Sequence, residues 1–195
     1  MKSLHGVIPS ISDAGQFEKF LRSSCKVCFV MNVHVTLVAA LIKKGHAAGR
    51  QIIVHLDMIN GLTSDEAGCQ YLCQVLNADG VISTKGKVVE TAVKNHKIAI
   101  LRVFLIDSRS LKKGIELANE VHPDYLEILP AIAYEIIPLI KKETDVTLIG
   151  GGLLMSSQQV DEALAAGFEA VSSSSPKLWL PLTAAAADGH AGKKS

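Results

Sequence analysis

The chain has 195 residues, of which 48% are hydrophobic and 20% are charged, and its formal net charge is +1 at pH 7. This length suits one well-buried domain, and the nearly neutral charge gives no support to a protein that coats nucleic acid, although a local basic patch is compatible with it. No run reaches the roughly 20 apolar residues that cross a bilayer, and no signal peptide opens the chain, so a cytoplasmic protein without a membrane partner is expected.

Short apolar runs alternate with amphipathic stretches along the whole chain. The expected strands begin at or near Val7, Lys26, Gln51, Asp79, Lys97, Asp124, Val146 and Phe168. The expected helices cover residues 13–22, 35–48, 64–76, 85–96, 108–121, 131–143 and 157–166. This repeat of about eight strand-and-helix units predicts an α/β fold, a single-domain TIM-type (β/α)8 barrel over residues 1–182. An open doubly wound sheet is the competing architecture, and residues 183–195 are predicted to be a disordered tail.

The last two expected strands end in small residues, with LIGGG from Leu148 and VSSSS from Val171. Backbone amides approach a phosphate closely only where side chains are small or absent, and a helix N-terminus adds unpaired donors. Ser175 and Pro176 have the pattern of an N-cap and first position of such a helix. Because barrels usually bind phosphate at their last two strands, and no GxGxxG motif is present, the pattern favours the barrel and predicts a phosphate cradle.

Polar residues interrupt the middle strands. By the strand period of two, His55 and Asp57 share one face and would both point into the mouth of a barrel, where they could hold a hydroxylated ligand or satisfy each other. Arg102 and Glu127 interrupt neighbouring strands, which is compatible with an internal ion pair, with contact to an anionic ligand, or with both. Lys85 opens a helix near the mouth, where it either binds an anion or faces solvent.

The four cysteines form two closely spaced pairs, a spacing that is also found in zinc sites. Cys28 sits in the apolar run VCFV, and Cys69 and Cys73 lie one turn apart in an expected helix. Free thiols in such places behave as small hydrophobic side chains, and a helix and a strand rarely supply a tetrahedral meeting point. No metal site is therefore predicted.

Five stretches, taken in this order, resemble one family: HLDMINGL from His55, DGVISTKG from Asp79, LRVFLIDS from Leu101, DYLEILPA from Asp124 and LIGGGLL from Leu148. The chain is similar, over about residues 8–179, to the glycerol-3-phosphate-responsive antiterminators, bacterial regulators of glycerol uptake operons. The resemblance implies a TIM-type barrel that binds glycerol 3-phosphate as its effector and needs no further cofactor. It also implies action on leader mRNA that prevents premature transcription termination, by a regulator without catalytic residues.

Position by position, the resemblance implies two groups of ligand-binding residues. The phosphate is expected on Gly151, Gly152, Ser173 and Ser174, and the glycerol end near His55, Asp57, Lys85, Arg102 and Glu127. The chain departs from the family pattern in three places. It has LPA rather than LPG at residues 129–131, serines throughout 172–175 where the family has a mixture such as TTSN, and a lysine at position 85 where arginine is frequent.

A second function stays open from the residues alone. A phosphate-binding TIM-barrel enzyme that acts on a small phosphorylated polyol or triose would have the same cradle, because a fold does not choose its function. His55, Asp57 and Glu127 could then serve as acid and base groups. The oligomeric state, including a homo-oligomer, also stays open.

Overall fold

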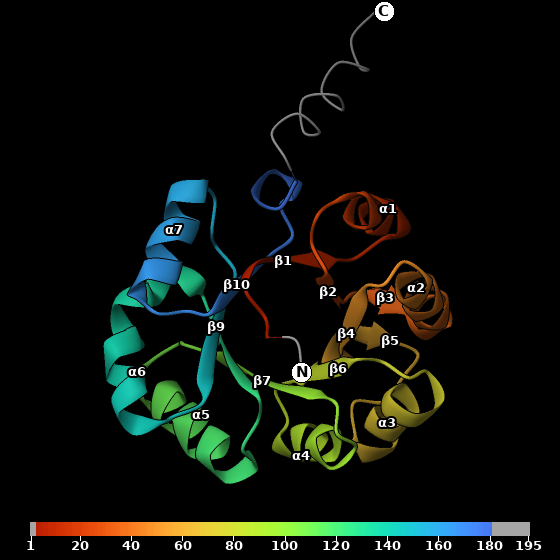
Figure 1. The fold of residues 1–195 in the computed structure, drawn as a ribbon. Helices are drawn as coiled ribbons and strands as arrows, with labels where there is room; N and C mark the ends of the chain where they lie inside the picture. The colour runs from red at the N-terminus through yellow and green to blue at the C-terminus, as the bar shows by residue number, and fades with distance from the viewer. Residues whose placement is uncertain (1–2, 181–195) are drawn as a thin grey trace, which may run out of the picture.

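The computed structural model describes residues 3–180, in which eight parallel strands close into a barrel. Figure 1 shows these strands as an inner ring and the helices as an outer ring. Around the barrel the strands follow the order β1-β10-β9-β8-β7-β6-β4-β2. The predicted TIM-type (β/α)8 barrel is confirmed, and the predicted tail at 183–195 lies outside the described residues.

All eight expected strands are present in the barrel. They are β1 (Gly6–Ile11), β2 (Val27–Val30), β4 (Gln51–His55), β6 (Gly80–Ser83), β7 (Ile98–Phe104), β8 (Tyr125–Leu129), β9 (Thr147–Gly151) and β10 (Ala170–Ser173). Each is short and is followed by the element that returns the chain to the start of the next strand, as a parallel barrel requires.

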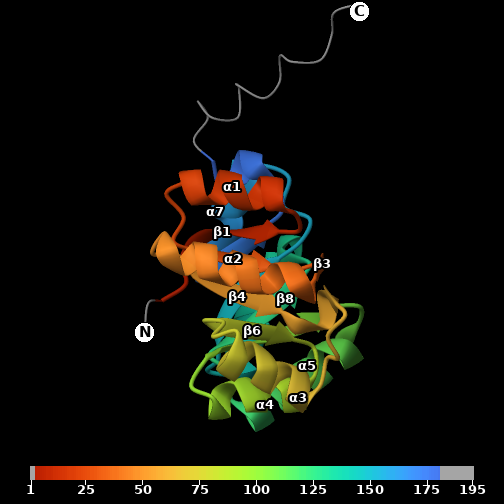
Figure 2. The same ribbon diagram turned by 90° about the vertical axis from the view of Figure 1, so that its right-hand side faces the viewer.

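The expected helices also form, and Figure 2 shows α1 to α4 following one another along one side of the barrel. The helices are α1 (Ala14–Arg22), α2 (Val35–Ala47), α3 (Glu66–Gln70), α4 (Gly86–Lys94), α5 (Ser108–Val121), α6 (Ile137–Glu143) and α7 (Ser157–Ala166). Two of them are composite, because α3 continues into the π-helical turn η2 (Tyr71–Val75) and the 3-10 helix η3 (Ala131–Ile136) precedes α6.

A small second sheet, which the sequence did not predict, is also present. Strands β3 (Val33–His34) and β5 (Ile59–Asn60) pair in parallel beyond the ends of β2 and β4. A 3-10 turn, η1 (Leu56–Met58), separates β4 from β5. Strands of two residues are too short to produce a periodic pattern, so no sequence argument would detect them.

The helix expected at Ser175 and Pro176 begins where it was predicted, but within the described part of the chain it is a single turn. Pro176 opens only a three-residue 3-10 turn, η4 (Pro176–Leu178), and the Ser175 side chain makes no capping hydrogen bond. A single turn of this length has no appreciable macrodipole. The turn after β10 therefore adds little to any attraction for anions at this end of the barrel.

The barrel core has two layers, because successive side chains of a strand point to opposite faces. Outward-facing side chains pack against the helices in one large cluster, and inward-facing ones form a smaller cluster inside the barrel. Leu4, from the arm before β1, belongs to the inner cluster and is 1% exposed. Its N–H donates to the hydroxyl of Tyr125 at 3.1 Å, so the arm closes the N-terminal end of the barrel.

Two aspartates hold the beginnings of neighbouring strands together. Asp124, just before β8, accepts the main-chain N–H of Ala99 in β7 at 2.8 Å. Asp79, just before β6, accepts the N–H of Ile52 in β4 at 2.7 Å. A buried N–H group without an acceptor lowers the free energy of unfolding, so these two carboxylates stabilise the fold.

The first prediction concerns Asp124. Its replacement in Asp124→Ala leaves the buried N–H of Ala99 without its acceptor and should lower the free energy of unfolding by about 1–3 kcal/mol, measured by urea denaturation. Asp145→Ala is the control, because Asp145 also lies shortly before a strand, β9, but is exposed. The control should change stability by less than about 0.5 kcal/mol. Equal losses in the two variants would contradict the assignment.

Candidate functional site

The C-terminal end of the barrel interior is polar, whereas the rest of the interior is apolar. The inward positions of β4, β7 and β8 carry Ile53, Ile100 and Tyr125 in the apolar inner cluster. Two residues further along each strand, on the same face, a polar residue follows. The residues of this polar layer are His55, Arg102 and Glu127, joined by Gly151 and Ser172 at the ends of β9 and β10.

A buried ion pair lies at the centre of this layer. Arg102 and Glu127 are paired in the register of β7 and β8, and their side chains are 6% and 0% exposed. Nε of Arg102 donates to Oε2 of Glu127 at 2.7 Å. Burying two charges costs free energy unless their remaining hydrogen-bonding groups are satisfied. The second carboxylate oxygen, Oε1, accepts the hydroxyl of Ser172 in β10 at 2.8 Å, so Glu127 is bound on both sides.

Gly151 makes the bond between Glu127 and Ser172 possible. It lies in β9, between the strands that carry the two partners. A Cβ at Gly151 would stand 2.7 Å from Oε1 of Glu127 and 2.8 Å from Oγ of Ser172, which is too close for either atom to stay in place. The hydrogen bond therefore crosses β9 through the space that the missing side chain leaves. The predicted phosphate contact of Gly151 stays a prediction.

A hollow of about 410 Å³ opens above this layer at the ends of β7, β9 and β10. Its walls combine one cation, several hydroxyl groups and an apolar loop. The lining residues are Ser10, Met31, Arg102, Leu129, Gly152, Leu153, Leu154, Met155, Ser172, Ser173, Ser174 and Ser175. Of the residues that the sequence predicted as ligand contacts, Arg102, Gly152, Ser173 and Ser174 meet in this hollow, with Glu127 and Gly151 directly behind it.

His55 lies inside the barrel and is 2% exposed. Both of its ring nitrogens are buried and have no hydrogen-bond partner among the described residues. Burial, together with the positive charge of Arg102, lowers the pKa of His55 to about 4. The ring is therefore neutral at physiological pH, and it carries an unused donor and an unused acceptor.

Asp57 does not share an inward strand face with His55, so that expectation is wrong. β4 ends at His55, and Asp57 belongs to the turn η1. Its carboxylate accepts the hydroxyls of Ser64 at 2.5 Å and Ser83 at 2.6 Å, and the N–H and hydroxyl of Thr84 at 2.7 and 2.8 Å. Burial raises the pKa of Asp57, but these hydrogen bonds outweigh it and the net shift is downward. Asp57 ties the loops after β4 and β6 together.

Lys85 also lies apart from the hollow around Arg102. Its side chain is exposed, and Nζ donates to the carbonyl oxygen of Ser64 at 2.7 Å. It lines a separate depression between the beginnings of α3 and α4. The structure does not bring Lys85 together with Arg102, and its predicted ligand contact stays a prediction.

Sequence reasoning missed much of the wall of the hollow. Met31 follows the inward-facing Phe29 by two residues, so strand period would have found it. Leu153 and Met155, in the loop after β9, have no such signal, and they are 64% and 82% exposed. Leu153 has φ +59°, a left-handed backbone conformation that is uncommon for residues other than glycine. The hollow therefore has one apolar, solvent-exposed wall.

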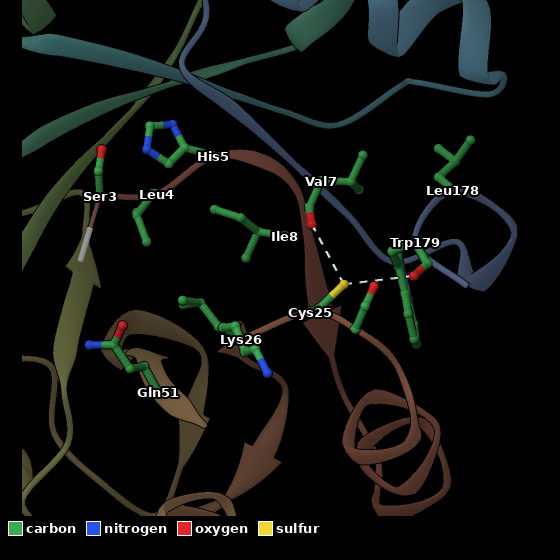
Figure 3. Close-up of a pocket in the computed structure, with 12 residues that line it drawn as sticks. Ser3, Leu4, His5, Val7, Ile8, Cys25, Lys26, Gln51, Leu178 and Trp179 are labelled. Carbon is green, nitrogen blue, oxygen red and sulfur yellow. Dashed lines mark hydrogen bonds between the residues drawn. The ribbon is translucent and has the colours of Figure 1, made fainter. Parts of the chain in front are cut away.

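A larger cavity, of about 680 Å³, lies at the opposite end of the barrel. Figure 3 shows it between the N-terminal arm, Cys25 and Trp179, where Sγ of Cys25 lies 3.9 Å from the carbonyl oxygen of Val7 and 3.7 Å from that of Trp179. The charged side chain on its wall, Lys26, is exposed to solvent. TIM barrels carry their functional groups at the C-terminal ends of the strands, so the smaller hollow is the better candidate site.

The cysteines do not gather into a metal site. Among residues 3–180, no group of three or more His, Cys, Asp or Glu side chains is arranged to hold a metal ion. Cys28, Cys69 and Cys73 are buried and free, and the sulfurs of Cys69 and Cys73 lie 3.9 Å apart. In the same described part of the chain, no helix has the length and apolar character needed to span a membrane.

A family model and two solved structures that are similar to this chain point to the same family. A family model described as "Glycerol-3-phosphate responsive antiterminator" matches residues 7–179. The crystal structure of a glycerol uptake operon antiterminator regulatory protein from Listeria monocytogenes is 34% identical, with a TM-score of 0.87 over 91% of this chain and 96% of that chain. A glycerol uptake operon antiterminator-related protein from Thermotoga maritima is 28% identical, with a TM-score of 0.80 over 91% of this chain and 99% of that chain.

Enzymes share the barrel at lower identity. Orotidine 5′-phosphate decarboxylase from Pyrococcus horikoshii is 18% identical, with a TM-score of 0.63 over 86% of this chain and 88% of that chain. A likeness at this level concerns the fold alone, because unrelated functions occur on the same barrel.

The second prediction tests the steric role of Gly151. In Gly151→Ala the added methyl group must push apart Glu127 and Ser172, which should lower the free energy of unfolding by about 1–3 kcal/mol in urea denaturation. The control is the same change in a Ser172→Ala background, where the hydrogen bond is already absent. The two changes should then be less than additive. Full additivity would mean that the methyl group acts elsewhere.

The third prediction follows from the lowered pKa of His55. The unfolded chain takes up a proton near pH 6.5 and the folded chain only near pH 4, so this contribution to stability is complete above pH 6.5 and is lost as the pH falls from 6.5 to 4. Between pH 7 and pH 4.5 the free energy of unfolding should fall by about 2–3 kcal/mol more in the parent protein than in His55→Gln, measured by urea denaturation at each pH. His96→Gln, at an exposed histidine, should keep the parent slope. A parent slope in His55→Gln would contradict the prediction.

Proposed function

The chain belongs to the glycerol-3-phosphate responsive antiterminator family, and from this premise we propose that it is a cytoplasmic sensor of glycerol 3-phosphate. On binding this effector, the protein acts on leader mRNA and prevents premature termination of transcription of glycerol uptake genes. The observation that carries the proposal is the buried Arg102, whose guanidinium lies on the wall of a serine-rich hollow at the ligand-binding end of the barrel.

Arg102 is suited to hold the phosphate group. Glu127 takes the Nε–H of the guanidinium, and one terminal nitrogen lies 3.9 Å from Sδ of Met58, which is a weak acceptor. The other N–H groups are left for a ligand. The carboxylate that neutralises the arginine is itself fully buried behind the hollow. A guanidinium fixed in this way presents its fork without a further loss of side-chain entropy, and such a fork matches two phosphate oxygens.

The small residues after β9 and β10 complete the phosphate site in this proposal. Gly152 has φ +78°, a conformation open to glycine, and it lies on the same wall as Ser173 and Ser174. Small side chains allow a phosphate oxygen to reach the backbone amides. The phosphate therefore lies between Arg102 and the ends of β9 and β10.

The glycerol end lies toward His55. The ring of His55 is neutral and both of its nitrogens are unpartnered, which is costly for a buried polar group. A hydroxyl group both donates and accepts, so a polyol that reaches His55 would offset that cost. His55 is not part of the wall of the hollow, and contact therefore requires the side chains around Arg102 to shift. Asp57 contributes indirectly, by holding the loops after β4 and β6.

The signal depends on a conformational difference at the mouth of the barrel. Leu153 and Met155 are largely exposed beside the hollow, and their burial over a bound ligand would favour a closed loop. A ligand shifts an equilibrium only if it binds one state better than the other. We propose that glycerol 3-phosphate favours the closed loop, and that this state acts on RNA. The RNA step rests on family membership alone.

An enzyme acting on a phosphorylated triose or polyol is the alternative. It would need His55, Asp57 or Glu127 as a proton acceptor. Both oxygens of Glu127 and both oxygens of Asp57 already accept hydrogen bonds, and the lowered pKa of His55 makes it a weak base. These two observations favour a sensor that binds its ligand unchanged.

The direct test is calorimetric titration of the whole protein with glycerol 3-phosphate, with glycerol and inorganic phosphate as controls and analysis of the mixture for product. Micromolar binding of glycerol 3-phosphate without turnover supports the sensor. Its affinity for the leader transcript is then measured with and without the effector. Conversion of the ligand would support the enzyme, and no binding of glycerol 3-phosphate would overturn the sensor.

The fourth prediction identifies the anion-binding group. Arg102→Lys keeps a positive charge for Glu127 but loses the fork, so affinity for glycerol 3-phosphate should fall more than about tenfold, measured by calorimetry. Arg109→Lys is the matched control, because it makes the same change at an exposed position on α5. The control should keep the parent affinity. Circular dichroism checks that both variants fold, and an unchanged affinity in a folded Arg102→Lys would remove Arg102 from the phosphate site.

A further inference from the structure

Ser172 has one hydroxyl hydrogen, and Glu127 takes it. We propose that Ser172 therefore determines which end of the ligand lies beside it, because it offers only lone pairs to the hollow and selects a hydroxyl group over a phosphate oxygen. The inference rests on the proposed function, in which the hollow binds a phosphate ester. It gives a role in specificity to Ser172, which was not predicted from the sequence to contact the ligand.

The direction of the hydrogen bond between Ser172 and Glu127 follows from their partners. Oε2 of Glu127 accepts Nε–H of Arg102 at 2.7 Å, and an arginine side chain can only donate. A carboxylate paired with arginine is an acceptor on both oxygens. The hydrogen in the 2.8 Å contact between Oγ of Ser172 and Oε1 of Glu127 must therefore come from the serine.

Ser172 lies where the unused part of its oxygen can contact a ligand in the hollow. The residue is 6% exposed and lies on the wall of the hollow. Its hydrogen points back across β9 toward Glu127, through the space left by Gly151. The face of Oγ that remains carries lone pairs only. A phosphate oxygen placed there meets another acceptor, whereas a ligand hydroxyl can donate to it.

The hydroxyl group of the neighbouring Ser173 acts in the opposite sense, as a hydrogen-bond acceptor within the protein. Its Oγ accepts the main-chain N–H of Ser175 at 3.1 Å, which leaves the hydroxyl hydrogen of Ser173 free to donate. Ser173 also lines the hollow. Two adjacent serines thus present an acceptor and a donor, and a ligand with a phosphate at one end and a hydroxyl at the other can satisfy both in one orientation. The structure therefore favours phosphate esters of polyols over alkyl phosphates.

The test compares two probes that differ in the hydroxyl groups alone, glycerol 3-phosphate and n-propyl phosphate, by calorimetry on the full chain. The parent protein should prefer glycerol 3-phosphate. In Ser172→Ala this preference, the ratio of the two affinities, should shrink about three- to tenfold, the loss expected for one neutral hydrogen bond. Any displacement of Arg102 in the variant weakens both ligands alike and cancels in the ratio.

Three further variants make the result specific. Ser172→Thr keeps the hydroxyl group and should therefore show the parent's preference for glycerol 3-phosphate. Ser157→Ala makes the same serine-to-alanine change at an exposed position on α7 and should leave the preference unchanged. In Glu127→Gln the amide oxygen must face the arginine donor, so the amide N–H₂ faces Ser172 and frees the serine hydrogen for the hollow. Affinity for n-propyl phosphate should then rise relative to glycerol 3-phosphate.

The outcomes separate this inference from the proposed function. If the parent binds both probes and Ser172→Ala weakens both to the same extent, the hollow is a phosphate site but Ser172 does not select the hydroxyl, and the inference is overturned. If the parent binds neither probe, the proposed function fails and the inference fails with it. A reduced ratio in Ser172→Ala, restored by Ser172→Thr, supports the inference.

Discussion

The ion pair between Arg102 and Glu127 is the constraint on which the candidate site depends. A charge inside a barrel is tolerated only with a partner, and the pair is tolerated only when its other hydrogen-bonding groups are also satisfied. Here the register of β7 and β8 supplies the partner. Ser172 satisfies the second carboxylate oxygen from two strands away. Gly151 must lack a side chain for that contact to exist. Four strands are thus arranged around one buried carboxylate.

The two ends of the barrel interior have different roles: the N-terminal end stabilises the fold, and the C-terminal end forms the candidate site. At the N-terminal end the inner cluster is apolar and is closed by Leu4, whose burial stabilises the fold. At the C-terminal end the same inward positions carry polar groups, and not all of them are satisfied. His55, in the same layer as the ion pair, keeps two unpartnered nitrogens. An unsatisfied group of this kind lowers stability, and the cost can be recovered only when a partner arrives from outside.

The sequence was informative where the signal is local or periodic. The eight strands and seven helices follow from apolar periodicity, and the ion pair was foreseeable because residues in consecutive strands of a parallel barrel are neighbours. Asp57 could not be placed, since its direction depends on β4 ending at His55 and on donors from Ser64 and Thr84 elsewhere in the chain. The direction of Lys85 likewise depends on a distant carbonyl group. The direction of the hydrogen bond between Ser172 and Glu127 depends on contacts among residues of three strands. No single stretch of the sequence encodes these contacts.

Ala131, one of the positions where the sequence was expected to depart from the family pattern, lies in the same region. Ala131 is fully buried at the beginning of η3 and does not have a positive φ, so it carries no strain that glycine would relieve. Its N–H donates to the carbonyl oxygen of Gly152 at 3.2 Å, which links the segment after β8 to the loop that forms one wall of the hollow. A Cβ at Gly150 would stand 2.9 Å from the methyl group of Ala131, so the two residues divide one space between them. A glycine at position 131 would donate the same main-chain N–H, so the hydrogen bond to the loop does not depend on the alanine. What the alanine adds is a buried methyl group packed beside Gly150, behind the hollow and not on its wall.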